Sequence, residues 1–406
     1  MHRLLPLLLA LSLPAALLSA DDAPKANTLT PKEIADGWLL LFDGETTFGW
    51  HNPSDSKWTI ADGMLAPQAD KPGLLVTTTA FANFEISLEY QTKPESKAAV
   101  LLGCDAEGKQ LKGANALYLQ HRGSGWCYYS AKVHGQSIEE ETFQVGNLGG
   151  GAKRISSRAA DASTSLQASH LALAGNGIVL RNIKLRPLET KPLFNGKDLT
   201  GWKKFEGNEK QAKSQFTVTP EGWLHIKNGP GDLQTEGQYA DFILQLECRT
   251  NGERLNSGIF FRCRPGEYQQ GYEAQIHNGW ADKAKDYVVE EYDPKTHELK
   301  EKKKVQSAAM DFGTGAIYRR IPARKAVAKD NEWFTMTVAA QGRHISTWVN
   351  GVQVVDWTDN RPLKDNARNG CRLEKGNISL QGHDPTTDLN FRNIRIVELA
   401  PEKKDK

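Results

Sequence analysis

The stretch HISTWVNGVQVVDW, residues 344–357, is typical of a β-hairpin. Apolar and polar side chains alternate on both sides of Asn350-Gly351, a pair that supplies the positive φ angles of a two-residue turn. Short alternating segments bounded by turn residues recur along the chain, and long helical periodicity is scarce. Regularly spaced short strands predict an all-β sandwich or jelly roll. Examples are FILQLECRT (242–250), NISLQGH (377–383) and LNFRNIRIVEL (389–399).

The chain also repeats itself. FANFEISLEYQT (81–92) resembles YADFILQLECRT (239–250), and VLRNIKLRPL (179–188) resembles NFRNIRIVEL (390–399), in the same order. Phe42 and Trp50 likewise match Phe194 and Trp202. We therefore expect two tandem β-sandwiches joined near 188–191. The expected parts are an N-terminal linker (21–36), a degenerate first copy (37–188), a second copy (189–400) and a charged tail (401–406).

The N-terminus predicts export. Met1-His2-Arg3 precedes an apolar run over residues 4–18 and a small-residue site at Ser19-Ala20, which is the pattern of a signal peptide over 1–20. No later segment is long and apolar enough to span a membrane. We expect a periplasmic or secreted protein, without a membrane span once the signal is removed.

Charge and cysteine content exclude some functions. The 406 residues carry a formal net charge of +2, whereas a nucleic-acid-binding protein normally presents a basic face. The five cysteines form no CxxC pair and have no metal-ligand spacing. We expect buried small side chains, with one disulfide as an alternative.

One strand of the second copy carries an unusual polar row. In GYEAQIHNGW (271–280), Glu273, Gln275 and His277 share one face, and the apolar residues 272, 274 and 276 share the other. In the first copy Leu117 or Tyr118 falls over Glu273, depending on the register, and neither is a carboxylate. Gly103 falls over Arg262. Any reaction is therefore expected in the second copy.

Two other segments receive simpler interpretations. Residues 283–311 are rich in lysine and glutamate and are expected to form a long surface loop or a short charged helix. Residues 146–169 are rich in Gly, Ser and Ala, and they are expected to form a loop in place of a recognisable counterpart of 333–357.

Several motifs together resemble the 3-keto-disaccharide hydrolase domain family. They are LFNGKDLTGW, NSGIFFR, GYEAQIHN, TGAIY, NEW, WVNGVQVVDW and FRNIRIVEL. The resemblance implies a concanavalin A-like jelly roll with a concave, carbohydrate-facing sheet, and cleavage of glycosides already oxidised to a ketone at C3. Two features depart from the family pattern: the 283–311 segment is longer, and Gly382 stands where an acidic residue is frequent.

The implied chemistry assigns roles to the polar row. A C3 ketone acidifies the C2 proton, so a base can form an enolate and expel the C1 substituent. We predict Glu273 and His277 as the candidate bases and Arg262 as the cation on the enolate. The predicted substrate-binding residues are Gln275, Tyr318, His383, Trp348 and Trp280.

Two alternatives accompany this prediction. A retaining glycosidase needs two carboxylates roughly 5–5.5 Å apart, and this strand offers one, so elimination fits better than ordinary hydrolysis. The expected partner is an oxidised di- or oligosaccharide or glycoside; a non-catalytic, lectin-like carbohydrate-binding protein is the alternative. If Glu273, His277 and His383 converge, they could bind a divalent cation such as calcium.

Overall fold

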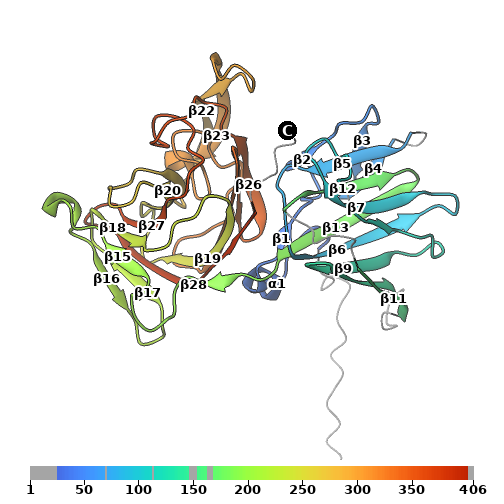
Figure 1. The fold of residues 1–406 in the computed structure, drawn as a ribbon, viewed down its shortest axis with the longest axis horizontal. Helices are drawn as coiled ribbons and strands as arrows, with labels where there is room; N and C mark the ends of the chain where they lie inside the picture. Colours follow the sequence, from blue (N-terminus) through green and yellow to red (C-terminus); the bar gives the residue numbers. More distant parts are fainter. Residues whose placement is uncertain (1–24, 69–70, 112–113, 146–152, 162–167, 401–406) are drawn as a thin grey trace, which may run out of the picture.

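A computed structural model describes residues 25–68, 71–111, 114–145, 153–161 and 168–400. Each copy forms a β-sandwich, and the two sandwiches lie side by side with a short helix between them (Figure 1). The all-β, jelly-roll prediction is confirmed. The expected signal peptide and charged tail lie outside the described residues. No helix in the described part is long and apolar enough to cross a bilayer.

The first copy packs two sheets around one core, in which Leu88, Val100 and Ile183 are completely buried. Its five-stranded sheet has the order β2 (Trp50–His51), β5 (Gly73–Thr77), β12 (His170–Gly175), β7 (Ala98–Cys104) and β8 (Ala116–Tyr118). The opposite sheet has the order β11 (Lys153–Asp161), β10 (Ser137–Gln144), β9 (Cys127–His134), β6 (Phe84–Thr92), β13 (Ile178–Pro187) and β1 (Leu39–Leu40). Strand β4 (Met64–Pro67) pairs with β13, and β3 (Trp58–Ala61) pairs with β4.

The second copy repeats this plan. Its five-stranded sheet has the order β15 (Trp202–Lys204), β18 (Gly231–Thr235), β27 (Asn377–Gly382), β20 (Ser257–Cys263) and β21 (Tyr272–Ile276). The opposite sheet has the order β26 (Val352–Thr358), β25 (His344–Val349), β24 (Phe334–Gln341), β19 (Phe242–Thr250), β28 (Asp388–Glu398), β17 (Leu224–Lys227) and β16 (Gln215–Val218), with β14 (Lys191–Pro192) paired to β28. Short 3₁₀ turns are η2 (Glu209–Gln211) and η3 (Met310–Phe312).

The expected hairpin at Asn350-Gly351 is present, and both residues have positive φ, 47° and 73°. The prediction of a loop in the first copy was partly wrong, because Lys153–Asp161 forms strand β11 and pairs with β10. The order β6-β9-β10-β11 repeats as β19-β24-β25-β26, so the counterpart of 333–357 is the segment that runs from β9 to β11.

Residues 283–311 were wrongly predicted to be a loop or helix. They lie mostly in a two-stranded hairpin, β22 (Trp280–Tyr292) and β23 (Leu299–Ala309), that projects from the second copy (Figure 1). Opposite charges meet across the ladder, as Glu290 meets Lys302 at 3.2 Å. Tyr287 and Val289 are buried. The charge composition suggested a solvated loop because these cross-strand pairs cannot be read locally.

The two sandwiches share a sheet and part of a core. Leu40 of β1 pairs in parallel with Val352 of β26, so one sheet continues from the first copy into the second. Trp348 and Ile243 of the second copy belong to the first copy's core cluster, and Trp348 is only 1% exposed. Trp348 was therefore wrongly predicted to bind substrate, because its side chain is buried between the two copies.

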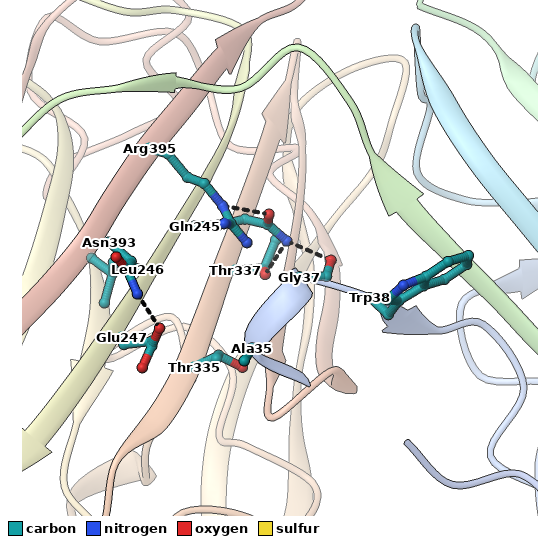
Figure 2. Close-up of a pocket in the computed structure, with 10 residues that line it drawn as sticks. All are labelled: Ala35, Gly37, Trp38, Gln245, Leu246, Glu247, Thr335, Thr337, Asn393 and Arg395. Atoms are coloured by element: carbon teal, nitrogen blue, oxygen red, sulfur yellow. Dashed lines mark hydrogen bonds between the residues drawn. The ribbon is translucent and has the colours of Figure 1, made fainter. Parts of the chain in front are cut away.

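The segment expected to be a linker, 21–36, ends in helix α1 (Pro31–Asp36). Thr30 and Glu33 form a capping box at the N-terminus of this helix. The helix stops at Gly37, whose φ is 85°. Gln245 of β19 donates a hydrogen bond from Nε2 to the Gly37 carbonyl (3.0 Å), as Figure 2 shows. This hydrogen bond links the start of the first copy to the sheet of the second copy that contains β19.

All five cysteines are free and buried, as the first of the two alternatives for them predicted.

Candidate active site

Strand β21 has the two faces that its sequence predicted. Tyr272, Ala274 and Ile276 point into the second copy's core, where Tyr272 stacks on Phe261 at 5.4 Å between ring centroids. Phe260 pairs with Glu273 and Gly258 with Gln275, so the polar residues lie on the outer face of the five-stranded sheet.

A polar pocket of about 190 Å³ opens over this face. Side chains from the sheet form its floor, and the segment between β21 and β24 contributes Tyr318 and Arg319. A volume below the roughly 300–1,000 Å³ of typical ligand pockets suits a single sugar ring. The lining residues are Asn256, Tyr268, Gln269, Glu273, Gln275, Tyr318, Arg319, Arg368, Gln381 and His383.

Glu273 is the buried carboxyl group of this pocket, and its residue is 7% exposed. Burial raises its pKa to about 8, and the negative charge of Asp311 adds to the rise. The positive charge of Arg368, whose Nη2 lies 3.8 Å from Glu273 Oε2, opposes the rise and outweighs the effect of Asp311, but it does not overcome burial. A carboxyl that exchanges its proton near neutral pH can serve as a general base or acid.

Gly258 makes room for this carboxyl group. A Cβ built on Gly258 would lie 2.8 Å from Glu273 Oε1, closer than two unbonded atoms tolerate. The glycine at the second position of β20 therefore leaves the space in which the Glu273 carboxyl lies.

Gln275 anchors the inserted segment. Its Nε2 donates to the Asp311 carbonyl (3.0 Å) and to Asp311 Oδ2 (2.9 Å), and Asn256 Nδ2 donates to the same Oδ2 at 2.7 Å. Asp311 adopts a left-handed backbone with φ 46°, uncommon for a residue other than glycine. Gln275 therefore acts mainly by holding Asp311 beside Glu273.

His277 lies beyond the end of β21 and outside the pocket lining. Its backbone N–H donates to Thr314 Oγ1 (2.9 Å), and its Nδ1 accepts from the Gly279 N–H at 3.3 Å. Burial lowers the pKa of His277, which Asp311 and Asp330 partly offset. Because Nδ1 accepts the Gly279 N–H, the neutral ring carries its proton on Nε2. His277 interacts electrostatically with Asp311, so it can influence the pocket through that residue.

Arg262 was predicted to face the substrate, and the structure places it elsewhere. The residue is completely buried, and its guanidinium donates to the carbonyls of residues 240, 342 and 372 and to Asp241 Oδ1. The β20–β27 register shifts between Phe260 and Cys263, and Arg262 has a φ of 49°. This bulge breaks the alternation on which the prediction rested.

The remaining predicted residues divide into two groups. Tyr318 and His383 line the pocket, whereas Trp280 is partly buried against the second copy's core. His383 is held by Asp384, with 2.7 Å between Nδ1 and Oδ2. Gly382 has no room for an acidic side chain, because its Cβ would collide with Ser214.

The three side chains suggested for calcium do not form a site. In the described residues no group of three or more His, Cys, Asp or Glu side chains is arranged to hold a metal ion. His277 lies outside the pocket that Glu273 and His383 line.

Several residues that line the pocket were not predicted from the sequence. Arg368 comes from the segment between β26 and β27, and its Nε donates to the Gln269 carbonyl at 2.6 Å. Within the described part of the chain, Asn256 Oδ1 and Gln381 Oε1 are buried without a hydrogen-bond partner. The available signals were the Asn256-Ser257-Gly258 motif and the alternation of β27.

The comparison with protein families identifies both copies. The model of the 3-keto-alpha-glucoside-1,2-lyase-like domain matches residues 37–185 and, separately, residues 189–397. The chain belongs to this family. A 3-keto-disaccharide hydrolase from Bacteroides thetaiotaomicron is 28% identical over 108 residues, which cover 23% of this chain and 37% of that protein.

Solved structures resemble about half of the chain. A candidate glycosyl hydrolase from Parabacteroides distasonis is 22% identical, with a TM-score of 0.38, over 52% of this chain and 94% of that one. A Bacillus subtilis protein with a galectin-like fold is 12% identical, with a TM-score of 0.33, over 53% and 97%.

The two copies of the 3-keto-alpha-glucoside-1,2-lyase-like domain differ at the pocket. Aligning Cys104 with Cys263 places Leu101 on Phe260, and the strand partner of Leu101 is Ala116. Ala116 therefore occupies the Glu273 position, one residue before the earlier of the two that the sequence suggested. The expectation that the first lyase-like domain lacks this carboxylate holds in either register.

Proposed function

We propose that the second copy cleaves glycosides whose sugar ring carries a ketone at C3. The observation that carries this proposal is Glu273, the one carboxyl among the described residues that line a ring-sized polar pocket, buried and with a pKa of about 8. Such a group can take a proton from carbon acidified by a neighbouring ketone, and it does not need the second carboxylate of a retaining glycosidase.

The reaction proceeds in two stages. Glu273 removes the C2 proton, the electron pair moves toward the C3 oxygen as an enolate, and the C1–O bond then breaks. The leaving oxygen takes a proton from Tyr318 or His383, which line the pocket. Water then attacks C1 of the C1–C2 double bond and gives its proton to the Tyr318 or His383 side chain that protonated the leaving group, while Glu273 returns its proton to C2. The net change is hydrolysis to a 3-keto-sugar and an alcohol.

Arg368 takes the role that the sequence gave to Arg262. Its guanidinium reaches Glu273 at 3.8 Å, and a fixed cation there can stabilise the enolate oxygen as charge develops. The amide side chains of Asn256 and Gln381, which line the pocket, are candidates to bind sugar hydroxyls. Tyr268 and Tyr318 supply the aromatic faces that tryptophans were expected to supply.

A purely carbohydrate-binding protein is the competing function. The burial of Arg262 and the position of His277 outside the pocket favour it, since a shared catalytic face was expected. However, the described lining contains no tryptophan platform, and a binding site gains nothing from burying an acid as deeply as Glu273. These features support the enzyme.

The deciding experiment compares a 3-keto-glucoside with its unoxidised parent, using the purified full-length chain. We expect aglycone release from the ketone alone, with incorporation of solvent deuterium at C2. Tight binding of both sugars without release would establish the binding protein instead. Release from both at equal rates would contradict the elimination.

We also propose that residues 1–20 direct export and that the mature chain begins near Asp21, because the apolar run ends at a small-residue site. N-terminal sequencing of the native protein tests this. Recovery of residues 1–20 would contradict it.

A further inference from the structure

A second pocket adjoins the candidate active site. It has a volume of about 150 Å³ and shares one lining residue, Arg319, with the first pocket. Three of its six lining residues are arginines. The lining residues are Val288, Glu290, Arg319, Arg320, Trp357 and Arg361.

Two of the charges in this pocket are already neutralised. Arg361 donates to the buried Asp359 from Nε (2.8 Å) and Nη2 (2.7 Å). Glu290 lies 3.2 Å from Lys302 Nζ, and its Oε2 accepts from the Tyr292 hydroxyl. Glu290 also attracts Arg320, but from beyond the distance of an ion pair.

Arg319 and Arg320 are the two arginines of this pocket whose charge is not directly paired. Among the described residues neither has a carboxylate within ion-pair distance, and Arg320 donates from Nη2 to the Arg368 carbonyl (2.5 Å). Burial lowers the pKa of Arg320, and the like charge of Arg361 in the same pocket lowers it further, against the partial opposition of Asp359 and Glu290. Gathering cations without a counterion is costly unless an anion offsets the repulsion.

The backbone holds one of these arginines in an unusual position. Arg319 is exposed and left-handed, with a φ of 59°, and its guanidinium lies 5.3 Å from the centre of the Tyr318 ring. Its position between the two pockets means that a group bound beside Arg320 would be continuous with a sugar bound beside Glu273.

We propose that the substrate carries an oxyanion, a carboxylate, sulfate or phosphate, which the pocket between Arg319 and Arg320 binds. This inference rests on the proposed function, since it concerns the substrate of the same site. Guanidinium groups bind such oxyanions through paired, charge-assisted hydrogen bonds. Trp357 closes the pocket beside them.

The experiment measures kcat/KM for a neutral 3-keto-glucoside and for 3-keto-glucosides with a carboxylate, sulfate or phosphate at C6. At least one anionic substrate should be preferred by about tenfold or more, the scale of a charged hydrogen bond. Arg320→Gln, which keeps a donor without the charge, should bring that preference close to one. Lys203→Gln removes an exposed charge elsewhere and should leave the preference unchanged.

The outcomes separate this inference from the function on which it rests. Equal rates for neutral and anionic 3-keto substrates, with no change of the ratio in Arg320→Gln, would overturn the anion pocket and leave the enzyme intact. If no 3-keto substrate reacts, titration with inorganic sulfate and phosphate still tests the pocket. Binding that Arg320→Gln weakens would support it, and absence of binding to the wild-type protein would overturn it.

Circular dichroism of Arg320→Gln checks that the fold survives. If it does not, Arg319→Gln replaces it, because Arg319 is exposed. The same loss of preference is then expected, and its persistence in Arg319→Gln would count against the proposal.

Discussion

The first and second copies place their strands in the same order, yet the pocket that Glu273 lines lies on the five-stranded sheet of the second. The first copy passes from β8 to β9 through residues 119–126, whereas the second passes from β21 to β24 through residues 277–333. The longer passage supplies Asp311, Tyr318 and Arg319. The sheet is thus a platform, and the chemistry comes from what is inserted above it.

The platform also differs in two small positions. Ala99 and Ala116 stand in the first copy where Gly258 and Glu273 stand in the second. Glu273 needs the space that a missing Cβ leaves, so the glycine and the carboxylate belong together. Neither change alone would convert one copy into the other.

The largest expected effect is the loss of activity on changing Glu273, which is expected in the second copy and not at the matching site of the first. Glu273→Gln should reduce turnover of a 3-keto-glucoside by about two to four orders of magnitude, because the amide cannot accept the C2 proton. Steady-state kinetics with circular dichroism measures this. Tyr118→Ala, at the position that matches Gln275 and 68% exposed, is the control in the first copy. Wild-type rates in folded Glu273→Gln would remove the distinction between the copies.

Arg262→Ala should affect stability rather than chemistry. It leaves Asp241 without its buried partner, a change that typically costs about 3–5 kcal/mol. The first copy has Gly103, also with positive φ (67°), at the equivalent bulge and needs no such pair. Denaturant unfolding tests the loss. A variant with normal stability and reduced kcat would restore Arg262 to the active site.

Gly258→Ala should displace the Glu273 carboxyl and reduce kcat/KM by about tenfold, the price of a poorly placed general base. The reverse change in the first copy, Ala99→Gly, should leave kcat/KM unchanged and cost roughly 0.5–1 kcal/mol of stability. Equal kinetic effects of the two substitutions would show that the pocket does not depend on this glycine.

The smallest effect concerns pH. Because Glu273 acts as a base only when ionised, kcat/KM should rise as pH passes about 8. Asp311 raises that pKa, so Asp311→Asn should lower it and move the rising limb to lower pH. Asp62→Asn changes a left-handed aspartate of the first copy and serves as the control. A limb that moves to higher pH would contradict the assigned charge interaction.

Local patterns predicted what depends on neighbours in the chain. The Asn350-Gly351 turn, the two faces of β21 and the repeat all followed from spacing. The bulge at Arg262 could not be predicted, because alternation holds only while the ladder stays in register. Trp348 was misassigned for another reason. It packs against residues of the first copy, which are far from it in the sequence, so the residues around Trp348 do not indicate this contact.

The same holds for the pocket. Four of the predicted site residues, Glu273, Gln275, Tyr318 and His383, line it, and their roles stay predictions. Arg368 and Asp311 were missed because each lies in an irregular segment, where no periodicity shows the direction of a side chain. The 280–309 hairpin was missed because charged residues favour strands only when opposite charges meet across the ladder.

The parallel pairing of Leu40 with Val352, together with Trp348 inside the first copy's core, has a consequence for how the two copies unfold. Two domains that share a sheet and a core melt together, so we expect a single cooperative transition for residues 37–400. Destabilising substitutions in the first copy would then reduce activity by lowering the fraction of folded protein, although that copy has alanine at the Glu273 position.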